Sequence, residues 1–480
     1  MVIALDLGSS SVRATLYDAR GRAVDGRFHQ VPYAPVTTRD GGVEHDPARL
    51  LDAAATCLDA VVRAARHDNV RAVAVTSFWH GLIGFDTAHR PVTPVFMWAD
   101  SRSTREASLL HDALDEDALH ARTGCHLHAS YWPAKLRWLA RERPADVRRV
   151  ARWGSIGEHL ELTFFGEAAT GLSMASGTGL LDQDTLGWDP EALAAGGIEA
   201  EHLFPLANLG DGRRGLRAPW AGRWPALRSL PWFPAIGDGA ASNIGSDCID
   251  PGRVALNVGT SAALRVVTDA AVAPPRGLWR YRVDRRRALL GGATSEGGNV
   301  YAWCREVLRL PDDAAVERAL AGRAPAVHGL TVLPFLAGER APGWRGDRRA
   351  AIAGLSLDTT ALDVAHAALE AVALRLALVY ELLAPHAAPD HVIVASGGAI
   401  SHSRAWTQML ADALGRAIHC SPEREATSRG AALLAFEALG ALPDATAVQA
   451  PLGEVFRPDA ARHARYRVAL EQHKRLDDRV

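Results

Sequence analysis

MVIALDLGSSSVRATLY, residues 1–17, and VALNVGTSAALRVV, residues 254–267, share one pattern. In each stretch an apolar run is followed by a turn of small residues that begins with glycine, and a second apolar run follows the turn. Such runs around a glycine turn are typical of β-hairpins. Aligning Gly8 with Gly259 places Asp6 on Asn257. The repeat predicts two related domains that each open with a hairpin, and a chance match between short hairpins is the alternative.

Between and after the hairpins, the chain alternates between helix and strand patterns. Asp46-Pro47 is a helix-start signal, and the apolar residues that follow recur at helical spacing before a strand at 70–77. A helical apolar stripe spans 365–383, and 391–400 is a buried strand that runs into a glycine turn. Residues 205–235 are rich in Gly, Pro, Arg and Trp without periodicity. We therefore predict an α/β protein with domains of residues 1–234 and 235–480.

The composition is that of a globular protein with little net charge. The chain has 480 residues, a formal net charge of -2 and 48% hydrophobic residues, which is enough for roughly two to four domains. The near-neutral charge gives no sign of the basic face that nucleic acid or a negative membrane surface requires. No uncharged apolar run in the sequence reaches the roughly 18 residues of a membrane span. We expect neither a nucleic-acid partner nor membrane association.

The N-terminus and the cysteines indicate a cytoplasmic protein. MVIALDLGSS lacks a basic segment and reaches Asp6 too early for the apolar core of a signal peptide. The five cysteines are odd in number and lie far apart without a CxxC motif. This spacing is typical of reduced thiols in a cytoplasm. The sequence does not indicate an oligomeric state, and a homodimer remains open.

The first hairpin carries a candidate phosphate and metal site. Asp6 ends the first apolar run, and the turn from Gly8 to Ser10 offers backbone N–H groups and hydroxyls to phosphate oxygens, with Arg13 just beyond. A carboxylate in this place can bind Mg²⁺ through water. A capping Asp in an ordinary turn is the alternative. The Walker and Rossmann glycine motifs are absent where a strand would enter a helix, so the hairpin itself is the candidate phosphate-binding device.

Two further glycine motifs follow the predicted domain boundary. Asp238 lies between Gly237 and Gly239, which would let a substrate approach the carboxylate closely as it accepts a proton from a hydroxyl. Gly397-Gly398 follows an apolar strand and would let a flat ligand such as adenine lie against the backbone. A plain turn is the alternative for Asp238, and a strand-to-helix turn is the alternative for the glycine pair.

Aromatic and charged residues gather in two places that suit a sugar. Trp79-His80 follows a buried strand, and Trp98-Ala99-Asp100-Ser101-Arg102 follows another apolar segment. An aromatic face supplies a stacking surface, and Asp, His and Arg can bind neighbouring hydroxyls. A surface salt bridge of Asp100 with Arg102 and core positions for the tryptophans are the alternatives.

In this order the motifs resemble those of the FGGY carbohydrate kinases, and the resemblance covers essentially the whole chain. AAIAGLSLDTTALDVAHAALE, residues 350–370, fits the C-terminal signature of that family, ending at Glu370. The other signature fits at Lys135-Leu136-Arg137-Trp138-Leu139, whereas Trp132 stands where Pro, Ser or Thr is expected. The resemblance implies two ribonuclease-H-like domains of the actin and hexokinase type, with ATP and a sugar meeting in the cleft between them.

The resemblance also implies roles for individual residues. Asp238 matches the catalytic base, which also contacts the substrate, and Asp6 matches the carboxylate on the Mg²⁺ side. The substrate-binding positions implied are Trp79, His80, Asp100, Arg102 and Tyr131. The ATP-binding positions implied are Gly8, Ser9, Ser10 and Arg13 in the first hairpin, Gly259, Thr260 and Ser261 in the second, and Gly397, Gly398 and Ala399 in the adenosine motif.

Several strings resemble the gluconate kinases of that family, namely WADSRS at 98–103, SGTGLLDQDTLGWDPEAL at 176–193 and VLPFLAGERAPGW at 332–344. Gluconate is an anion, so we expect His80 and Arg102 as candidate cations or N–H donors. Gly157 and Glu296 stand where these kinases usually have Lys and Asn. The resemblance predicts an ATP-dependent kinase that converts D-gluconate to 6-phosphogluconate. The alternatives are a xylulose, ketopentose or polyol kinase, and a sugar-sensing or actin-like protein without transfer activity.

Overall fold

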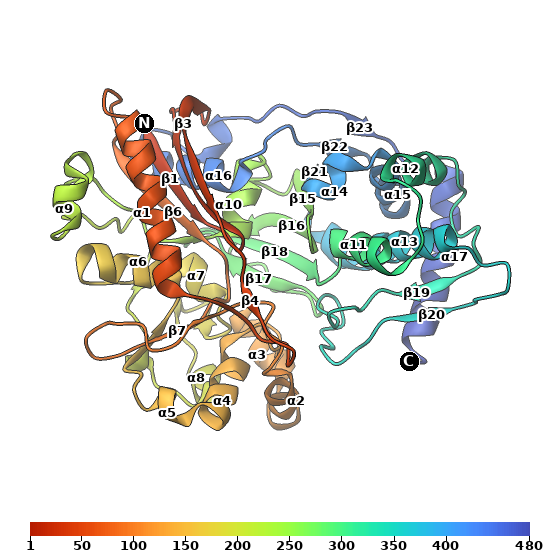
Figure 1. Ribbon diagram of the computed structural model, residues 1–480, viewed down its shortest axis with the longest axis horizontal. Helices are drawn as coiled ribbons and strands as arrows, with labels where there is room; N and C mark the ends of the chain where they lie inside the picture. The colour runs from red at the N-terminus through yellow and green to blue at the C-terminus, as the bar shows by residue number, and fades with distance from the viewer.

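Two β-sheets, each built around one of the repeated hairpins, form the centres of the two halves of the molecule (Figure 1). The computed structural model describes residues 1–480. The first sheet has the order β14-β6-β1-β2-β3, with the bounds Ile236–Gly237, Ala72–Ser77, Val2–Leu7, Ser11–Tyr17 and Ala23–Pro32. The second has the order β17-β18-β16-β15-β21-β22-β23, with the bounds Trp279–Arg282, Arg287–Thr294, Ala262–Asp269, Arg253–Val258, Val392–Ser396, Ile418–Cys420 and Val455–Phe456.

The two hairpins occupy equivalent places in their sheets. β1 is antiparallel to β2 and parallel to β6, and β15 is antiparallel to β16 and parallel to β21. The register places Asp6 beside Thr76 and Asn257 beside Ser396. Both hairpins predicted from the sequence are therefore confirmed, and they share one topology.

Helices cover the sheets where their apolar stripes predict. α1 (Pro47–Ala64) packs on β2 and β3; it begins with the predicted cap, because the Asp46 carboxylate accepts a hydrogen bond from the Ala48 N–H. α13 (Ala361–Leu383) packs on β16 and β18, and its first turn is a capping box of Thr360 and Asp363. α16 (Ala426–Ala438), from the C-terminal half, packs on β1 and β6 of the first sheet.

The halves are joined by a close helix pair, α10 (Asp238–Gly245) against α16. A Cβ on Gly245 would lie 1.7 Å from the carbonyl oxygen of Ala426, and one on Gly430 would lie 1.8 Å from that of Ala241. Only glycine permits such an approach of two backbones. This contact fixes the start of α10, and with it Asp238, between the two sheets.

Most of the segment between β6 and β14 forms a smaller lobe below the first sheet in Figure 1, and α9 lies apart from it on the left. The helices of the segment are α2 (Thr104–Ala113), α3 (Glu116–Thr123), α4 (Trp132–Glu142), α5 (Pro144–Val147), α6 (Ile156–Phe165), α7 (Leu172–Ser176), α8 (Pro190–Gly196) and α9 (Trp220–Arg223). Its strands are β7 (Ile83–Phe85), β8 (Val95–Phe96), β9 (Arg152–Gly154), β10 (Thr170–Gly171), β11 (Leu181–Asp182), β12 (Gly187–Trp188) and β13 (Leu206–Ala207), with β4 (Val36–Thr37) and β5 (Val43–His45) pairing beside β8.

The remaining elements surround the second sheet. They are α11 (Gly298–Val307), α12 (Asp313–Ala321), α14 (Gly398–His402), α15 (Arg404–Leu414), α17 (Ala460–Asp477), β19 (Thr331–Leu333) and β20 (Ala351–Ala353). None of the helices is long and apolar enough to cross a membrane. The five cysteines are free, as their spacing predicts. The division of the chain between residues 234 and 235 stays a prediction.

Candidate active site

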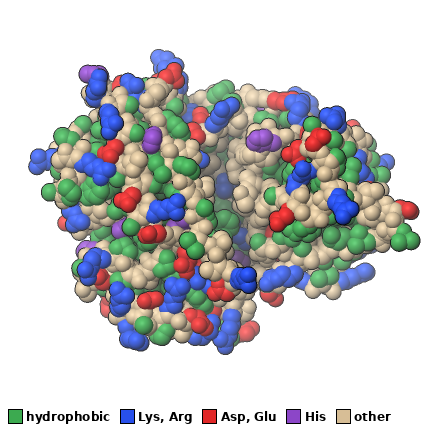
Figure 2. Space-filling model, in the orientation of Figure 1, with side chains coloured by type: hydrophobic (Ala, Val, Ile, Leu, Met, Phe, Trp, Pro, Cys, Tyr) green, Lys and Arg blue, Asp and Glu red, His purple; other side chains and the backbone are tan.

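The turns of both hairpins are exposed at the ends of buried strands. Ser9, Ser10 and Thr260 are exposed, whereas the strands before them are almost wholly buried. The Ser9 carbonyl accepts a hydrogen bond from His45 Nε2 at 3.0 Å, which fixes the first turn from below. A groove separates the two halves of the molecule in Figure 2. The exposed turns are therefore open to an anionic ligand.

Asp6 is a buried carboxylate with an unused oxygen. Its side chain is 5% exposed, and its Oδ1 has no hydrogen-bond partner. Arg13 Nη1 lies 3.9 Å from Oδ2 and also donates to Glu425 at 3.4 Å, so the Arg13 charge is shared between two carboxylates. Burial raises the pKa of Asp6 to about 7; Arg13 opposes the rise and Asp238 adds to it. A hydrated divalent cation at Oδ1 would satisfy the free oxygen and favour the charged form, so the residue fits Mg²⁺.

Asp238 begins α10, so the plain turn considered from the sequence is wrong. The two glycines in this short helix, Gly239 and Gly245, disfavour helix formation, so α10 gains its stability from packing on α16. The Gly239 N–H donates to Asp238 Oδ1 at 2.8 Å. Burial raises the pKa of Asp238, and the positive charge of Arg265 on β16 opposes that rise. Asp6 and Asp238 are 232 positions apart in the sequence, yet they lie close enough for the Asp238 charge to raise the pKa of Asp6.

The glycines beside Asp238 make room for Trp79 rather than for a substrate. A Cβ on Gly237 would lie 1.9 Å from Trp79 Cε2, and one on Gly239 would lie 2.6 Å from Cζ3 of the same ring. The indole N–H donates to the Ser173 carbonyl at 2.8 Å, and the ring is 6% exposed. The expectation that these glycines admit the substrate is therefore corrected. Trp79 is a wall that holds the start of α10.

His80 and Tyr131 lie together on the aromatic side of the site. Their rings are edge to face at 5.1 Å, and the Tyr131 hydroxyl lies 2.6 Å from that of Tyr281 on β17. His80 Nδ1 donates to the Gly177 carbonyl, which leaves Nε2 as an acceptor. Burial lowers the pKa of His80 well below its usual value. His80 is therefore neutral at pH 7 and does not supply the cation expected from the sequence.

Arg102 is a cation whose charge is already paired. Its guanidinium donates to Asp100 and to Glu44, and it lies 4.4 Å from the centre of the Trp138 ring. Its side chain is 6% exposed, and the second Asp100 oxygen also accepts from the Val43 N–H at 3.2 Å. The salt bridge that the sequence left as an alternative is present, but it is buried rather than on the surface. Arg102 therefore supplies no free positive charge to an anionic substrate.

Two other arginines place unpaired positive charge in the site. Arg265 lies on β16 against Gly239, with Nε 3.3 Å from the position of a Cβ there, and Arg340 lies over the Trp98 ring at 5.3 Å. Neither guanidinium takes part in an ion pair, and the Nε of each is buried without a partner. Sequence reasoning missed both. The usable signals were an Arg in the apolar strand 262–269 and the string GERAP at 338–342.

A cavity of about 630 Å³ lies beside the second turn, on the side away from Trp79. Its lining includes Gly259 and Thr260 from the turn, Gly398 and Ala399 from the start of α14, and Trp406 from α15. The volume is within the usual range for small-molecule sites, about 300–1,000 Å³. The structure thus brings together four of the residues expected to bind ATP, and Tyr301 and Trp406 are apolar walls that sequence reasoning missed.

The predicted glycine pair divides between two tasks. Gly397 has a φ of +104°, and a Cβ there would lie 2.4 Å from the Val258 carbonyl oxygen. Glycine is therefore needed here for the backbone conformation and its close approach to β15. Gly398 faces open space, with His402 Nδ1 at 3.9 Å as the nearest atom to its missing Cβ. Ser261 closes the turn, because its carbonyl accepts from the Gly259 N–H at 2.9 Å. The room expected for a flat ligand is therefore at Gly398.

Gly157 and Glu296, the two departures from the gluconate-kinase pattern, both lie at closely packed positions. A Cβ on Gly157, in α6, would lie 2.8 Å from that of Ala235, so a larger side chain would meet the segment before Asp238. Glu296 is buried, and its Oε1 accepts from the Ala337 N–H at 3.3 Å. Burial raises the pKa of Glu296 to about 7. The loss of lysine at 157 removes one expected cation, and the arginines at 265 and 340 supply others.

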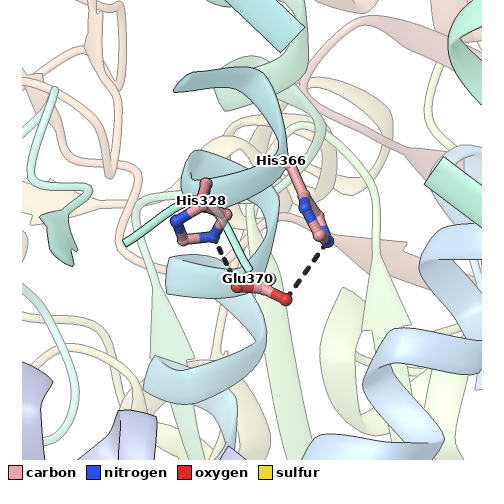
Figure 3. Close-up of side chains that lie close together, drawn as sticks. All are labelled: His328, His366 and Glu370. Carbon is pink, nitrogen blue, oxygen red and sulfur yellow. Dashed lines mark hydrogen bonds and ion pairs between the residues drawn. The ribbon is translucent and has the colours of Figure 1, made fainter. Parts of the chain in front are cut away.

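A second polar cluster, away from the groove, has the residue types of a metal site (Figure 3). The ligand atoms of His328, His366 and Glu370 lie within 4.8 Å of one another. The Leu330 N–H donates to His328 Nδ1 at 2.9 Å, so the proton of the neutral ring is on Nε2, which donates to Glu370 Oε2 at 2.8 Å. A protonated nitrogen cannot bind a metal. With the Tyr466 hydroxyl, which donates to Oε1 at 3.0 Å, these residues form what we name the Glu370 clamp.

Comparison with known proteins covers nearly the whole chain. Residues 1–245 match the N-terminal domain, and residues 254–439 the C-terminal domain, of the FGGY family of carbohydrate kinases. A gluconokinase of Bacillus subtilis (strain 168) is 27% identical over 469 residues, which cover 95% of this chain and 91% of that protein.

Two solved structures from Lactobacillus acidophilus are also similar. A ligand-bound xylulose kinase has a TM-score of 0.91, and a gluconate kinase has a TM-score of 0.90. Each is 27% identical to this chain, and each alignment covers 99% of this chain and 97% of the other. The relatives therefore share one fold and differ in the sugar that their names give.

Proposed function

Because the chain belongs to the FGGY family of carbohydrate kinases and is an ATP-dependent sugar phosphotransferase, we propose that it phosphorylates a sugar acid. The proposed reaction converts D-gluconate and ATP to 6-phospho-D-gluconate and ADP. Asp238 is the general base, the two hairpin turns hold the phosphates, and the cavity beside Gly398 holds adenosine.

The position of Asp238 is the observation that carries this proposal. It begins α10 between the two sheets, where its charge raises the pKa of Asp6 in the first hairpin. Burial raises the pKa of Asp238 itself, and the charge of Arg265 in the second hairpin opposes that rise. A base in this place lies between a phosphate turn on each side. Phosphoryl transfer depends chiefly on positioning and charge stabilisation, which this arrangement supplies.

The chemistry follows from the environment of that carboxylate. Asp238 accepts the proton of the sugar hydroxyl while the hydroxyl oxygen attacks the γ-phosphorus of ATP and the bond to the ADP oxygen breaks. Its pKa is raised by burial toward the working pH, which favours proton acceptance in the transition state. Trp79 holds the start of α10, so the base is fixed before the substrate binds.

Asp6 would hold a hydrated Mg²⁺, since its free buried oxygen suits that ion. Bound there, the ion supplies positive charge to the phosphates of ATP. Arg13 keeps Asp6 near the turn by attraction and is itself anchored to Glu425 at the start of α16.

The choice of a sugar acid rests on unpaired positive charge. Arg265 and Arg340 face the site without a carboxylate partner, as an anionic substrate requires. Similarity to gluconokinases supports the same choice. A ketopentose such as xylulose is the second candidate, because the xylulose kinase structure is as similar to this chain as the gluconate kinase structure.

The test of the base is Asp238→Asn, which keeps the shape and removes the charge. We expect kcat to fall about 10²- to 10⁴-fold, the usual contribution of general-base catalysis, while the Kd for ATP stays within a few-fold by isothermal titration calorimetry. Asp25→Asn, at an exposed position on β3, is the matched control and keeps full activity. Turnover of Asp238→Asn at near wild-type rate would show that another group is the base.

The test of the substrate is ADP release over D-gluconate, xylulose, ribulose, glycerol and erythritol. We expect the highest kcat/KM for gluconate. A higher value for a neutral sugar would reject the sugar acid and leave the kinase assignment in place. Each product is identified by mass spectrometry, so that ATP hydrolysis is not mistaken for transfer.

A further inference from the structure

Arg340 is a nearly buried guanidinium without an anion. Its residue is 8% exposed, its Nε has no hydrogen-bond partner, and none of the ion pairs of the structure includes it. Its one close contact of note is the Trp98 ring, 5.3 Å from Cζ. A buried charge that lacks a partner is costly. The five donors of the planar guanidinium form a fork that matches a carboxylate.

The neighbouring acid is not the missing partner. Glu339 is 1% exposed, but its carboxylate accepts from Arg345 at 2.6 Å, from Arg375 and from the Gly343 N–H at 3.1 Å. Arg345 and Arg375 also pair with Asp477 on α17. This network uses the charge of Glu339 and leaves Arg340 without an ion-pair partner.

The same network holds the backbone of Arg340 in place. The Trp344 N–H donates to the Arg340 carbonyl at 2.7 Å, and the Ala341 N–H donates to the Ala293 carbonyl at 3.0 Å. The Trp344 indole N–H donates to the Gly277 carbonyl at 2.9 Å. A side chain on such a fixed segment binds a ligand with little ordering cost.

The groups around Arg340 lie on the sugar side of the site. Burial is the main cause of the low pKa values of His80 and Lys135, and the charge of Arg340 lowers both further. The pKa of Lys135 is about 7. The Arg340 charge also opposes the rise that burial causes in the pKa values of Tyr131 and Asp238. Asp238 is therefore the acid among the groups near Arg340. Arg340 does not line the cavity beside Gly398. The guanidinium therefore faces the aromatic wall and the base.

We propose that Arg340, stacked on Trp98, forms a two-point ion pair with the carboxylate of the sugar acid while Asp238 contacts the hydroxyl at the other end. Trp98 fixes the plane of the guanidinium, so that its fork points in one direction. This assignment rests on the proposed function, because it supplies the group that distinguishes an aldonic acid from a neutral sugar of the same length.

The experiment compares D-gluconate with D-glucitol, in which CH₂OH replaces the carboxylate, in wild type and Arg340→Met. We expect kcat/KM for gluconate to fall about 10²-fold, as for loss of one partner of a buried charged pair. We expect kcat/KM for glucitol and the KM for ATP to stay within about three-fold of wild type. Arg340→Lys keeps the charge without the fork and recovers part of the gluconate activity. Arg349→Met, at an exposed position of the same loop, is the control and matches wild type.

A phosphate of ATP is the other oxyanion that Arg340 could hold. In that case Arg340→Met would raise the KM for ATP and lower turnover of gluconate and glucitol equally, and the proposal would be overturned. Equal losses on both sugars with unchanged KM for ATP would assign a structural role and overturn it too. Thermal unfolding of each variant separates misfolding from these outcomes, and Arg340→Lys provides the same comparison if Arg340→Met does not fold.

A failure of the proposed substrate would look different. If wild type phosphorylates only neutral sugars, inhibition of that activity by gluconate tests the ion pair directly. Inhibition of wild type that is lost in Arg340→Met would support the ion pair and reject gluconate as the substrate. Inhibition of equal strength in both would reject the role of Arg340.

Discussion

Two buried carboxylates of the molecule, Asp6 and Glu370, differ in their hydrogen bonding and in the direction in which their pKa values are shifted. In the groove, Asp6 keeps an oxygen without a partner and burial raises its pKa to about 7. In the Glu370 clamp, the carboxylate accepts hydrogen bonds from His328, from Tyr466 and from the Ala326 N–H. Burial would raise the pKa of Glu370, but its interactions with His328 and His366 lower it to about 2.

The difference shows that the Glu370 clamp adds to the stability of the fold, whereas the unpartnered Asp6 oxygen reduces it. A satisfied buried carboxylate ties elements together: the Glu370 clamp links α13, α17 and the segment before β19. A buried carboxylate with a free oxygen costs folding free energy and is retained where a ligand completes it. We therefore expect substitutions in the groove to lower activity and substitutions in the clamp to lower stability.

Of the substitutions that compare these two clusters, Asp6→Asn has the largest expected effect; it converts the first hairpin to the Asn257 pattern of the second. Loss of the charge at this site should lower kcat about 10²- to 10³-fold, as for other electrostatic groups at a transition state. The free energy of unfolding without metal should stay equal or rise, because an isolated buried charge is removed. Steady-state kinetics over a Mg²⁺ series and urea unfolding measure both. A variant with full activity and lower stability would reverse the comparison.

The second-largest effect is expected at Gly237, where one substitution should lower both stability and activity. In Gly237→Ala the new Cβ would overlap the Trp79 ring, which holds the start of α10 beside Asp238. Overpacking of this kind costs about 1–3 kcal/mol of stability, and displacement of the base should lower kcat at the same time. Gly210→Ala is the control, since a Cβ there meets nothing within 4 Å. Unchanged kcat in a destabilised Gly237→Ala would show that Asp238 tolerates movement of α10.

A smaller effect is expected in the Glu370 clamp. Glu370→Gln removes the charge-assisted hydrogen bonds and should lower the free energy of unfolding by about 1–3 kcal/mol. The groove is not touched, so kcat and the KM for ATP should match wild type at a temperature well below unfolding. Chemical denaturation and kinetics on the same preparation check both statements. Loss of kcat in the folded variant would place the clamp in the active site.

The smallest expected effect concerns pH: the contributions of Asp6 and Glu370 to folding stability should change with pH in opposite directions. The pKa of Asp6 rises from 3.8 to about 7 on folding, so its contribution to stability falls as the pH rises through that window. The pKa of Glu370 falls from 4.5 to about 2, so its contribution is present above pH 4.5 and is lost as the pH falls toward 2.

Urea unfolding of the metal-free protein measures this pair of slopes. The stability of Asp6→Asn relative to wild type should grow between pH 4 and pH 7. The deficit of Glu370→Gln should shrink as the pH falls below 4.5. Slopes of the same sign for the two variants would contradict the contrast between the clusters.

The local patterns of the sequence predicted most of the secondary structure that matters for the site. Both hairpins, the start of α1 at Asp46 and the stripe of α13 follow from apolar period, turn residues and caps, which act over a few residues. The expected meeting of Gly259 and Thr260 with Gly398 and Ala399 is also found in one cavity. Short-range signals suffice there because each motif lies at the end of its own strand.

Other parts of the site depended on long-range packing. α10 is rich in glycine and small residues and is helical because α16, from the other end of the chain, packs on it. Likewise, His80 loses its charge and Arg102 finds partners only once the elements around them assemble. Sequence spacing carries no information on which buried charges will be paired.

The sequence by itself therefore determined the fold, the two hairpins with their glycine turns and the membership of a sugar-kinase family. The tertiary structure alone decided which charges remain free: it paired Arg102, neutralised His80 and left Arg340 without an anion. The reason is that a hairpin or helix is set by neighbours along the chain, whereas the state of a buried charge is set by every group that surrounds it in space.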